Sequence, residues 1–486
     1  MDAQANQLII QSLDALGGDE ALNQLTGVTY HVPNIYRSRT LMESYSALRA
    51  DTTIAVGGNQ NISFSFASPE LQQRIDRFFQ TSEFWLVNNP TNLPISFSLV
   101  VEDGEDGFAC YVQGNNYVFD PVTARGGYVD VYDRILDLTV ILNPQTHLPY
   151  IIRSIEDHYI FGKSYHDLVV YNYTSVSGIQ FPRRFKTMYN HDSLLEDFIV
   201  TDIDVNPKFA PEFFQGLNAS QSPTPKTAPA RISGYGHAEI GEYSFNRIWG
   251  GEYTGTLANL SATHPDPSLP NIWHLQFLDS PLWQQMVMEF EHGVIVVDAP
   301  PHQNQLVIKW VNDALKKPIT HFWPTHHHHD HTYAAKEFVE IGAKIITPKV
   351  AVPHWSYIPG AQLEIFGNEP FVYKDDTLQA RFHWSQEGVH SDDFTYATIT
   401  KANPRCNDSM VIIEADAWSP GIVGFEFDQA EALDWVRQIV ADGVARNGIV
   451  WPIHGSPTPL TELFELTGYE YPNYSVCDMM SGPPLC

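Results

Sequence analysis

Five histidines and one aspartate stand next to each other at residues 326–331, in the sequence HHHHDH. Imidazole nitrogens and carboxylate oxygens are the ligands that zinc takes in proteins. The run is internal and lies between a predicted strand (ITHFW) and a predicted helix (YAAKEFVEIGA), which argues against a purification tag. The types and density of these residues therefore predict a metal site.

The conformation expected around this run divides its side chains into two sets. Alternate residues share a face in the extended segment that leaves the strand, so His326 and His328 point the same way. Asp330 and His331 then fall at the start of the helix. The run can offer these two sets to two adjacent ions, while its two remaining histidines point away and are not predicted to be ligands.

Residues 325–331 match the T-H-x-H-x-D-H motif of the metallo-β-lactamase-fold hydrolases, and the chain resembles this superfamily over residues 240–460. The superfamily has four further motifs, and each finds a counterpart here in the same order. They place Asp298 in GVIVVDAP, His390 in VHSDDFTYATI, Asp416 in VIIEADAWSP and His454 in IVWPIHG. The resemblance implies an α+β catalytic domain, an αββα sandwich of two mixed sheets with helices outside.

The resemblance also implies a role for each candidate residue. Two Zn²⁺ ions are expected, with iron or manganese as alternatives. Asp298 would orient a ligand from behind, and Asp330 would also accept the proton of the nucleophile. The first ion would be held by His326, His328 and His390, the second by Asp330, His331 and His454, with Asp416 bridging them.

Departures from the superfamily pattern bear on the subclass. Asp416 stands where one class of lactamases has cysteine, which argues against a lactam-opening enzyme of that type. His328 replaces the glutamate of the flavodiiron oxygen reductases. Val389 precedes His390 where glycine is usual, so His383 is a competing candidate, although it falls within the strand-like RFHW.

The expected reaction is hydrolysis of a small-molecule ester or lactone, with thioesters and amides also open. Two bound ions would lower the pKa of a shared water to about 7 and supply a hydroxide. One alternative is an iron-dependent oxidoreductase of the dioxygenase type on the same fold. Another is a lipid-binding module with a vestigial metal site. The substrate and the oligomeric state are not predicted.

The chain divides by composition into four parts. Short strand-like segments rich in Val, Ile, Tyr, Phe and Thr follow a helix predicted over 7–26, and they predict a mostly antiparallel β domain. The segments T-x-LP, Y-x-x-x-SGI-x-FP and V-x-VNP in this domain resemble the half-barrel of bacterial lipoprotein carriers. The predicted parts are the β-rich domain 1–205, a linker 206–235, the catalytic domain 236–460 and a C-terminal tail 461–486.

Charge and composition limit the partners. The 486 residues include 28 Lys and Arg against 57 Asp and Glu, a net charge of −29 that repels phosphate backbones and disfavours nucleic acid as a partner or substrate. No apolar run approaches the roughly 18–20 residues of a membrane span. Six Asn-x-Ser/Thr sequons favour a secreted glycoprotein over a cytoplasmic protein, and we expect a disulfide between Cys477 and Cys486, with two free thiols as the alternative.

Overall fold

The computed structural model divides the chain into two compact units. The first unit contains the described residues up to 215, except for residues 46–48 and 160–161, which belong to the second unit together with the described residues from 253 onward. The described residues are 3–38, 46–48, 55–79, 95–102, 108–115, 138–158, 160–191, 193–215, 253, 255–280, 284–300, 303–386, 388, 390–421 and 429–481.

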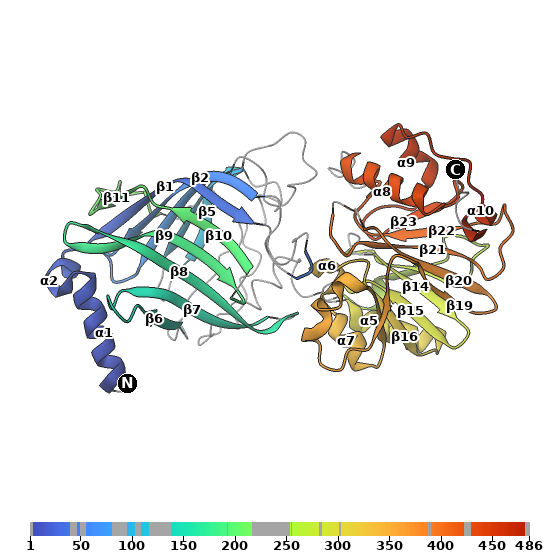
Figure 1. Ribbon diagram of the computed structural model, residues 1–486, viewed down its shortest axis with the longest axis horizontal. Coiled ribbons are helices and arrows are strands. Elements are labelled where there is room, and N and C mark those ends of the chain that lie inside the picture. The colour runs from blue at the N-terminus through green and yellow to red at the C-terminus, as the bar shows by residue number, and fades with distance from the viewer. Residues whose placement is uncertain are drawn as a thin grey trace. The chain divides into compact units, whose positions relative to one another are not determined.

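Two helices and eleven strands make up the described part of the first unit (Figure 1). The helices are α1 (Ala3–Leu16) and α2 (Gly18–Asn23). The strands are β1 (Gly27–Ser38), β2 (Ala55–Ser65), β3 (Gln72–Phe79), β4 (Ile95–Glu102), β5 (Phe108–Asn115), β6 (Leu138–Leu142), β7 (Pro149–His158), β8 (Gly162–Val176), β9 (Ile179–Tyr189), β10 (Ser193–Ile199) and β11 (Asp202–Val205).

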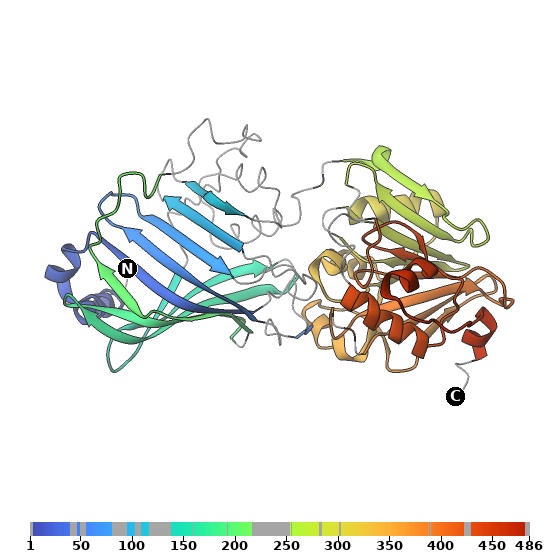
Figure 2. The same cartoon turned by 90° about the horizontal axis from the view of Figure 1, so that it is seen from above.

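These strands form one sheet in the order β5-β4-β3-β2-β1-β10-β9-β8-β7-β6, with β11 paired to β1. Every pair in the sheet is antiparallel, which confirms the predicted antiparallel β domain. The sheet is strongly curved (Figure 2). Its core lies where Ala21 and Leu22 of α2 pack against Val28, Val32 and neighbouring apolar residues. The resemblance to lipoprotein carriers stays a prediction.

The described part of the second unit contains thirteen strands and several helices. The strands are β12 (Leu260–Thr263), β13 (Ile272–Phe277), β14 (Gln284–Phe290), β15 (Gly293–Val297), β16 (Ile319–Trp323), β17 (Lys344–Pro348), β18 (Leu363–Phe366), β19 (Phe371–Lys374), β20 (Leu378–Trp384), β21 (Thr395–Lys401), β22 (Val411–Glu414), β23 (Ile449–Pro452) and β24 (Thr458–Pro459). The helical segments are η1 (Leu257–Asn259), α5 (Asn304–Trp310) continued by η2 (Val311–Leu315), α6 (His329–Thr332), α7 (Ala335–Glu340), η3 (Lys349–Ala351), η4 (His354–Tyr357), α8 (Gln429–Ala441), α9 (Leu460–Thr467) and α10 (Val476–Ser481).

Two mixed sheets, β12–β18 and β19–β24, pack face to face with helices outside. Side chains alternate between the two faces of a strand, and β15 shows this division. Ile295 and Val297 join residues of the second sheet in one core, whereas Val294 and Val296 pack in another core with residues of α5 and α7. Helices α8 and α9 cover the outer face of the second sheet (Figure 1). The expected αββα arrangement is therefore present.

The parallel strand pairs explain how distant motifs meet. Strands β15 and β16 are parallel, with Val297 opposite Trp323, and β22 and β23 are parallel, with Glu414 opposite Pro452. Strand β21 runs antiparallel to β22, so the start of β21 lies beside the end of β22. Segments that leave the carboxyl ends of these strands therefore emerge at the same edge of their sheet, together with the segment that enters β21.

The described part of the predicted C-terminal tail, residues 461–481, packs on the sandwich. Leu460, Leu463 and Phe464 of α9 and Met479 of α10 are buried in the core of the sandwich. The predicted Cys477–Cys486 disulfide is wrong, because Cys477 is bonded to Cys406, 71 residues earlier. Folding brings the loop after β21 against α10, where Val476 N donates to Cys406 O. The spacing of the cysteines along the chain does not indicate this contact.

The predicted linker 206–235 lies mostly outside the described residues, so its composition remains the basis for that prediction. Residues 46–48 and 160–161, which we placed in the β-rich domain, pack with the second unit instead. Within the described residues, no helix combines the length and apolar character needed to span a membrane.

Candidate metal centre

The histidine run forms a tight turn between β16 and α6. His326 follows Thr325, whose carbonyl oxygen accepts hydrogen bonds from the amide and the hydroxyl of Thr395, both at 2.7 Å. Helix α6 then begins at His329, and the Thr332 hydroxyl lies 3.0 Å from the carbonyl oxygens of both His327 and His328. These contacts hold the backbone so that neighbouring side chains of the run face in different directions.

Asp298 locks this turn from behind. Its Oδ1 accepts from Thr325 N at 2.7 Å, and its Oδ2 accepts from His331 Nδ1 at 2.8 Å. The residue is fully buried and adopts a φ of 55°. A positive φ is uncommon outside glycine, asparagine and aspartate, and such strain persists only where the surroundings impose it. Asp298 therefore lies where we expected an orienting carboxylate, and its side chain accepts a hydrogen bond from the predicted ligand His331.

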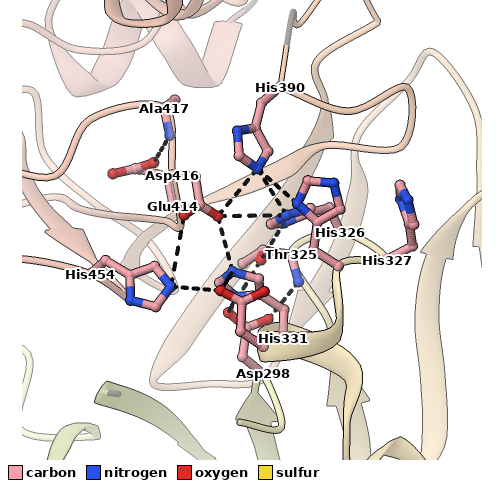
Figure 3. A network of polar contacts seen from close by, with 12 residues as sticks. Asp298, Thr325, His326, His327, His331, His390, Glu414, Asp416, Ala417 and His454 are labelled. Carbon is pink, nitrogen blue, oxygen red and sulfur yellow. Dashed lines mark hydrogen bonds and ion pairs between the residues drawn. The ribbon is translucent and has the colours of Figure 1, made fainter. Parts of the chain in front are cut away.

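The first predicted ligand set converges on one point. His390 Nε2 lies 3.1 Å from His326 Nε2 and 3.0 Å from His328 Nδ1. Asp416 Oδ2 lies 3.5 Å from His326 Nε2 and 3.6 Å from His390 Nε2. Figure 3 shows the ring of His390 pointing down between these groups.

The second predicted set lies beside the first. His331 Nε2 is 3.3 Å from Asp330 Oδ2 and 3.0 Å from Asp416 Oδ2. His454 Nε2 is 3.2 Å from Asp330 Oδ2 and 3.7 Å from Asp416 Oδ1. Asp416 thus contacts both sets, and Figure 3 shows its carboxylate between His390, His331 and His454. All seven predicted ligands meet here, drawn from four separate segments of the chain.

The atoms in these two sets fit a metal better than they fit one another. His331 Nε2 and Asp416 Oδ2 are buried and close, yet their geometry makes no hydrogen bond. In the first set, ring nitrogens face ring nitrogens, and a neutral imidazole has only one N–H to give. A divalent cation would accept a lone pair from each of these nitrogen and oxygen atoms at once, which protons shared among them cannot do.

Burial and neighbouring charges shift the pKa values of several predicted ligands towards the protonation states that bind metals. Burial and the nearby rings of His328 and His331 hold the pKa of His326 well below its ordinary value, so this ring is neutral. Burial alone would raise the pKa of Asp330, but His331 and His454 hold it well below its usual range. Neutral imidazole and ionised carboxylate are the forms that bind metals.

His331 has the opposite shift. Burial lowers its pKa, but the carboxylates of Asp330, Asp298 and Asp416 together raise it well above the ordinary value. The pKa of His454 is also raised: burial opposes the shift, and Asp330 and Asp416 favour it. Excess negative charge is therefore concentrated at the second set, where a cation could replace the protons.

Glu431 is a functional candidate that the sequence analysis did not identify. Its position at the start of α8 is typical of a helix-capping residue, which is the only sequence signal it carries. In the structure its carboxylate Oε1 accepts from His390 Nδ1 at 3.1 Å, and the side chain is only 2% exposed. With Nδ1 on this carboxylate, Nε2 is the ring nitrogen of His390 that is directed at the first set.

A third group, formed by His327, Asp392 and Asp393, also lies within ligand distance. In this group, the aspartates face hydrogen-bond donors. His327 Nδ1 lies 2.7 Å from Asp393 Oδ1, and Asp392 Oδ1 accepts from Ala47 N at 3.1 Å. Direct contacts therefore hold both aspartates of this group without an ion, and among the described residues His327 Nε2 makes no hydrogen bond. The ring of His327 points away from the converging ring nitrogens (Figure 3), as expected from the alternation along the run, although its centroid lies 4.8 Å from that of His328.

The competing candidate His383 lies on β20, away from both sets. Its Nε2 contacts Thr398 Oγ1 at 3.1 Å, and its ring stacks on Tyr396 with 4.7 Å between centroids. The described residues thus bring His390 to the centre and leave His383 in the core.

Comparison with known proteins gives matches to solved structures alone. No family model and no curated protein matches the chain. A metallo-β-lactamase from Pontibacter korlensis is 13% identical, with 43% of this chain and 97% of that chain covered and a TM-score of 0.33. One from Hirschia baltica is 15% identical (43% and 97% covered, TM-score 0.31), and a flavo di-iron protein from Thermotoga maritima is 10% identical (43% and 60% covered, TM-score 0.33).

The order of the strands and the placement of the motifs define the fold of the second unit. Two facing mixed sheets carry helices on their outer faces. Five motifs in the expected order converge at one edge of these sheets. Four of them form two adjoining His/Asp groups, and the fifth supplies Asp298, which contacts His331. The C-terminal unit is accordingly a metallo-β-lactamase-fold domain with a candidate metal-binding cluster.

Proposed function

We propose that this protein is a metal-dependent hydrolase with two zinc ions, which acts on an ester or lactone carbonyl. The observation that carries the proposal is the pair of adjoining groups, His326–His328–His390 and Asp330–His331–Asp416–His454. Asp416 contacts both groups with its carboxylate and is the proposed bridge. Because the protein would keep all seven ligand positions, a vestigial site is disfavoured.

Bound zinc would acidify a water to a pKa of about 7 and polarise the substrate carbonyl. Side chains of the protein would accept the proton and hold the ligands in place. Asp330 Oδ2 contacts His331 and His454 and is held ionised, so it can accept the proton of the attacking water. His331 is kept in one orientation by Asp298, which supports a fixed geometry during the reaction.

The exposure of the side chains indicates where a substrate would enter. The side chains of His326 and His331 are 0% exposed, whereas those of Asp330, Asp416 and His390 are 13–14% exposed. The accessible side of the centre is thus the side of these three residues. The chain carries a net charge of −29. This supports a neutral carbonyl substrate rather than a nucleic acid.

The Cys406–Cys477 disulfide supports the further proposal that the protein is secreted. Structural disulfides persist in oxidising compartments and are rare in the cytosol. The acidic composition and the six sequons agree with that location.

Elemental mass spectrometry of the purified protein tests the metal centre first. We expect about two zinc ions per chain, and about one in a variant with both His326→Ala and His328→Ala, because that variant keeps only the second group. The wild-type protein should hydrolyse members of a panel of aryl esters and lactones, and the double variant should not.

The outcomes separate the proposal from its alternatives. One iron per chain together with oxygen consumption would replace the hydrolase with an oxidoreductase. No metal after dialysis against zinc would overturn the ligand assignment. Turnover that survives in the double variant, with the first group's metal absent, would overturn the two-ion mechanism.

A further inference from the structure

Two short segments from the N-terminal half of the chain lie in the second unit, next to the histidine run. Residues 46–48 come from the connection between β1 and β2, and residues 160–161 come from the connection between β7 and β8. Ala47 is 7% exposed and Ile160 is 4% exposed, and both belong to the core that contains Trp355 and Ile358. They are therefore built into the catalytic domain.

Ala47 joins two parts of the catalytic domain through its backbone. Its N–H donates to Asp392 Oδ1 at 3.1 Å, and its carbonyl oxygen accepts from His354 Nδ1 at 3.0 Å. Asp392 is two residues after the predicted ligand His390 and precedes Asp393. One residue of the N-terminal half thus ties the ligand-bearing segment before β21 to helix η4.

Phe161 packs against the same group of residues through its aromatic ring. The centroid of its ring lies 5.7 Å from His329, 6.0 Å from His354 and 5.4 Å from Tyr357. His329 is 0% exposed and begins helix α6, the helix that carries Asp330 and His331. The ring of Phe161 therefore packs directly against the turn that presents the second ligand set.

His327 and Asp393 connect these two contacts. They lie 2.7 Å apart, are both about 1% exposed, and come from the two segments that carry the ligands. The ring of His327 lies 5.7 Å from that of His354. The result is a continuous buried cluster behind the centre, with the ligands on its other side.

We propose that residues 46–48 and 160–161 are positioning elements of the metal centre, so that the N-terminal half of the chain completes the catalytic domain. This inference rests on the proposed function, because it assigns these residues a role in holding the proposed ligands. Ala47 fixes the segment of His390 through Asp392, and Phe161 fixes the helix of Asp330 and His331 through His329. Neither segment touches the proposed metals.

Zinc retention in the full chain tests the proposal. Phe161→Ala and Asp392→Ala should each release zinc to a chelator about 10-fold faster than the wild-type protein, the lower end of the effect expected for outer partners of metal ligands. Phe161→Leu and Asp392→Asn should restore most of the retention, because leucine keeps apolar packing and asparagine keeps the acceptor for Ala47 N.

A core substitution separates positioning from loss of stability. Phe338→Leu alters the same apolar core, where Phe338 is 0% exposed and stacks on Phe322. It should lower the midpoint of thermal unfolding at least as much as Phe161→Ala and leave the zinc release rate unchanged. Equal release rates in the wild-type protein and in both alanine variants would overturn the inference, as would equally accelerated release from Phe338→Leu. A wild-type protein without metal would instead contradict the proposed function.

Discussion

Three histidine rings around the candidate centre each have a carboxylate at Nδ1. A carboxylate at this position fixes the tautomer and the orientation of the ring and leaves Nε2 available. Two of these rings are predicted ligands and the third belongs to the cluster behind them. The pairs are Asp298 with His331 at 2.8 Å, Glu431 with His390 at 3.1 Å and Asp393 with His327 at 2.7 Å.

Glu431 gives the sharpest prediction at the scale of a residue. Glu431→Ala should weaken metal binding to the first group about 10-fold or more, because His390 loses the acceptor that fixes its ring. Glu431→Gln keeps an acceptor oxygen and should retain most of the affinity. Competition with a chromogenic chelator measures both variants. Wild-type affinity in Glu431→Ala would show that His390 is held without this contact.

The lowered pKa of His383 leads to a prediction about the stability of the fold at acid pH. Burial, with help from Arg381, lowers its pKa from 6.5 to about 3. The unfolded chain therefore binds a proton more readily than the folded chain, so this residue costs no stability above pH 6.5 and destabilises the fold progressively as the pH falls from 6.5 towards 3. The slope contributed is at most about 1.4 kcal/mol per pH unit.

His383→Gln should remove that slope. Urea unfolding between pH 4 and pH 6.5 should show a free energy of unfolding that depends less on pH in this variant than in the wild-type protein. His292→Gln is the matched surface control, since its side chain is 86% exposed. An unchanged dependence in His383→Gln would mean that other groups dominate acid unfolding.

At the scale of elements, the disulfide fastens helix α10 to the sandwich. Cys406 follows β21 and Cys477 lies in α10, so the bond closes a long loop that includes α8 and α9. Val476 and Met479 of α10 are buried in the core. The covalent link and the apolar packing therefore act on the same helix.

Cys406→Ala with Cys477→Ala should lower the free energy of unfolding by about 4 kcal/mol, the chain-entropy value for a loop of this length. Urea unfolding of the oxidised wild-type protein and the double variant measures the difference. Reduced wild-type protein is the control, and it should match the variant. Equal stability of the oxidised protein and the variant would contradict a stabilising role for this bond.

At the scale of the whole molecule, metal binding is expected to stabilise the two units to different extents. The candidate ligands lie in the second unit, and the first unit has its own core around α2, β1 and β9. A metal bound only to folded protein stabilises it by about 4 kcal/mol at a thousandfold excess over Kd. The metal should therefore stabilise one unit selectively.

Calorimetry with and without a chelator tests this prediction. Two unfolding transitions are expected, and the chelator should lower the temperature of only one. The variant with His326→Ala and His328→Ala should show a smaller shift of the same transition. A chelator that shifts both transitions equally, or neither, would contradict the assignment of the metal to the second unit.

Local sequence patterns were sufficient for much of this protein. The histidine run stands between a strand and a helix, and alternation along extended chain separated His326 and His328 from His327. The resemblance to the superfamily, through the order of its motifs, led to Asp298, His390, Asp416 and His454, which the structure brings together. These features depend on neighbours within a few residues or on a motif order that the chain shares with the superfamily it resembles.

Contacts between distant segments were decided by the tertiary structure alone. Glu431 carries the sequence pattern of a helix start, and only packing of α8 shows that it reaches His390. Cys477 pairs with Cys406 because α10 packs against the loop after β21, a contact between segments 71 residues apart. Ala47 makes its contacts with Asp392 and His354 through its backbone N–H and carbonyl oxygen. Almost every residue type has these atoms, so the identity of residue 47 does not indicate its proposed positioning role. Such contacts arise because folding chooses partners by shape and burial across long separations, which leaves no local pattern to read.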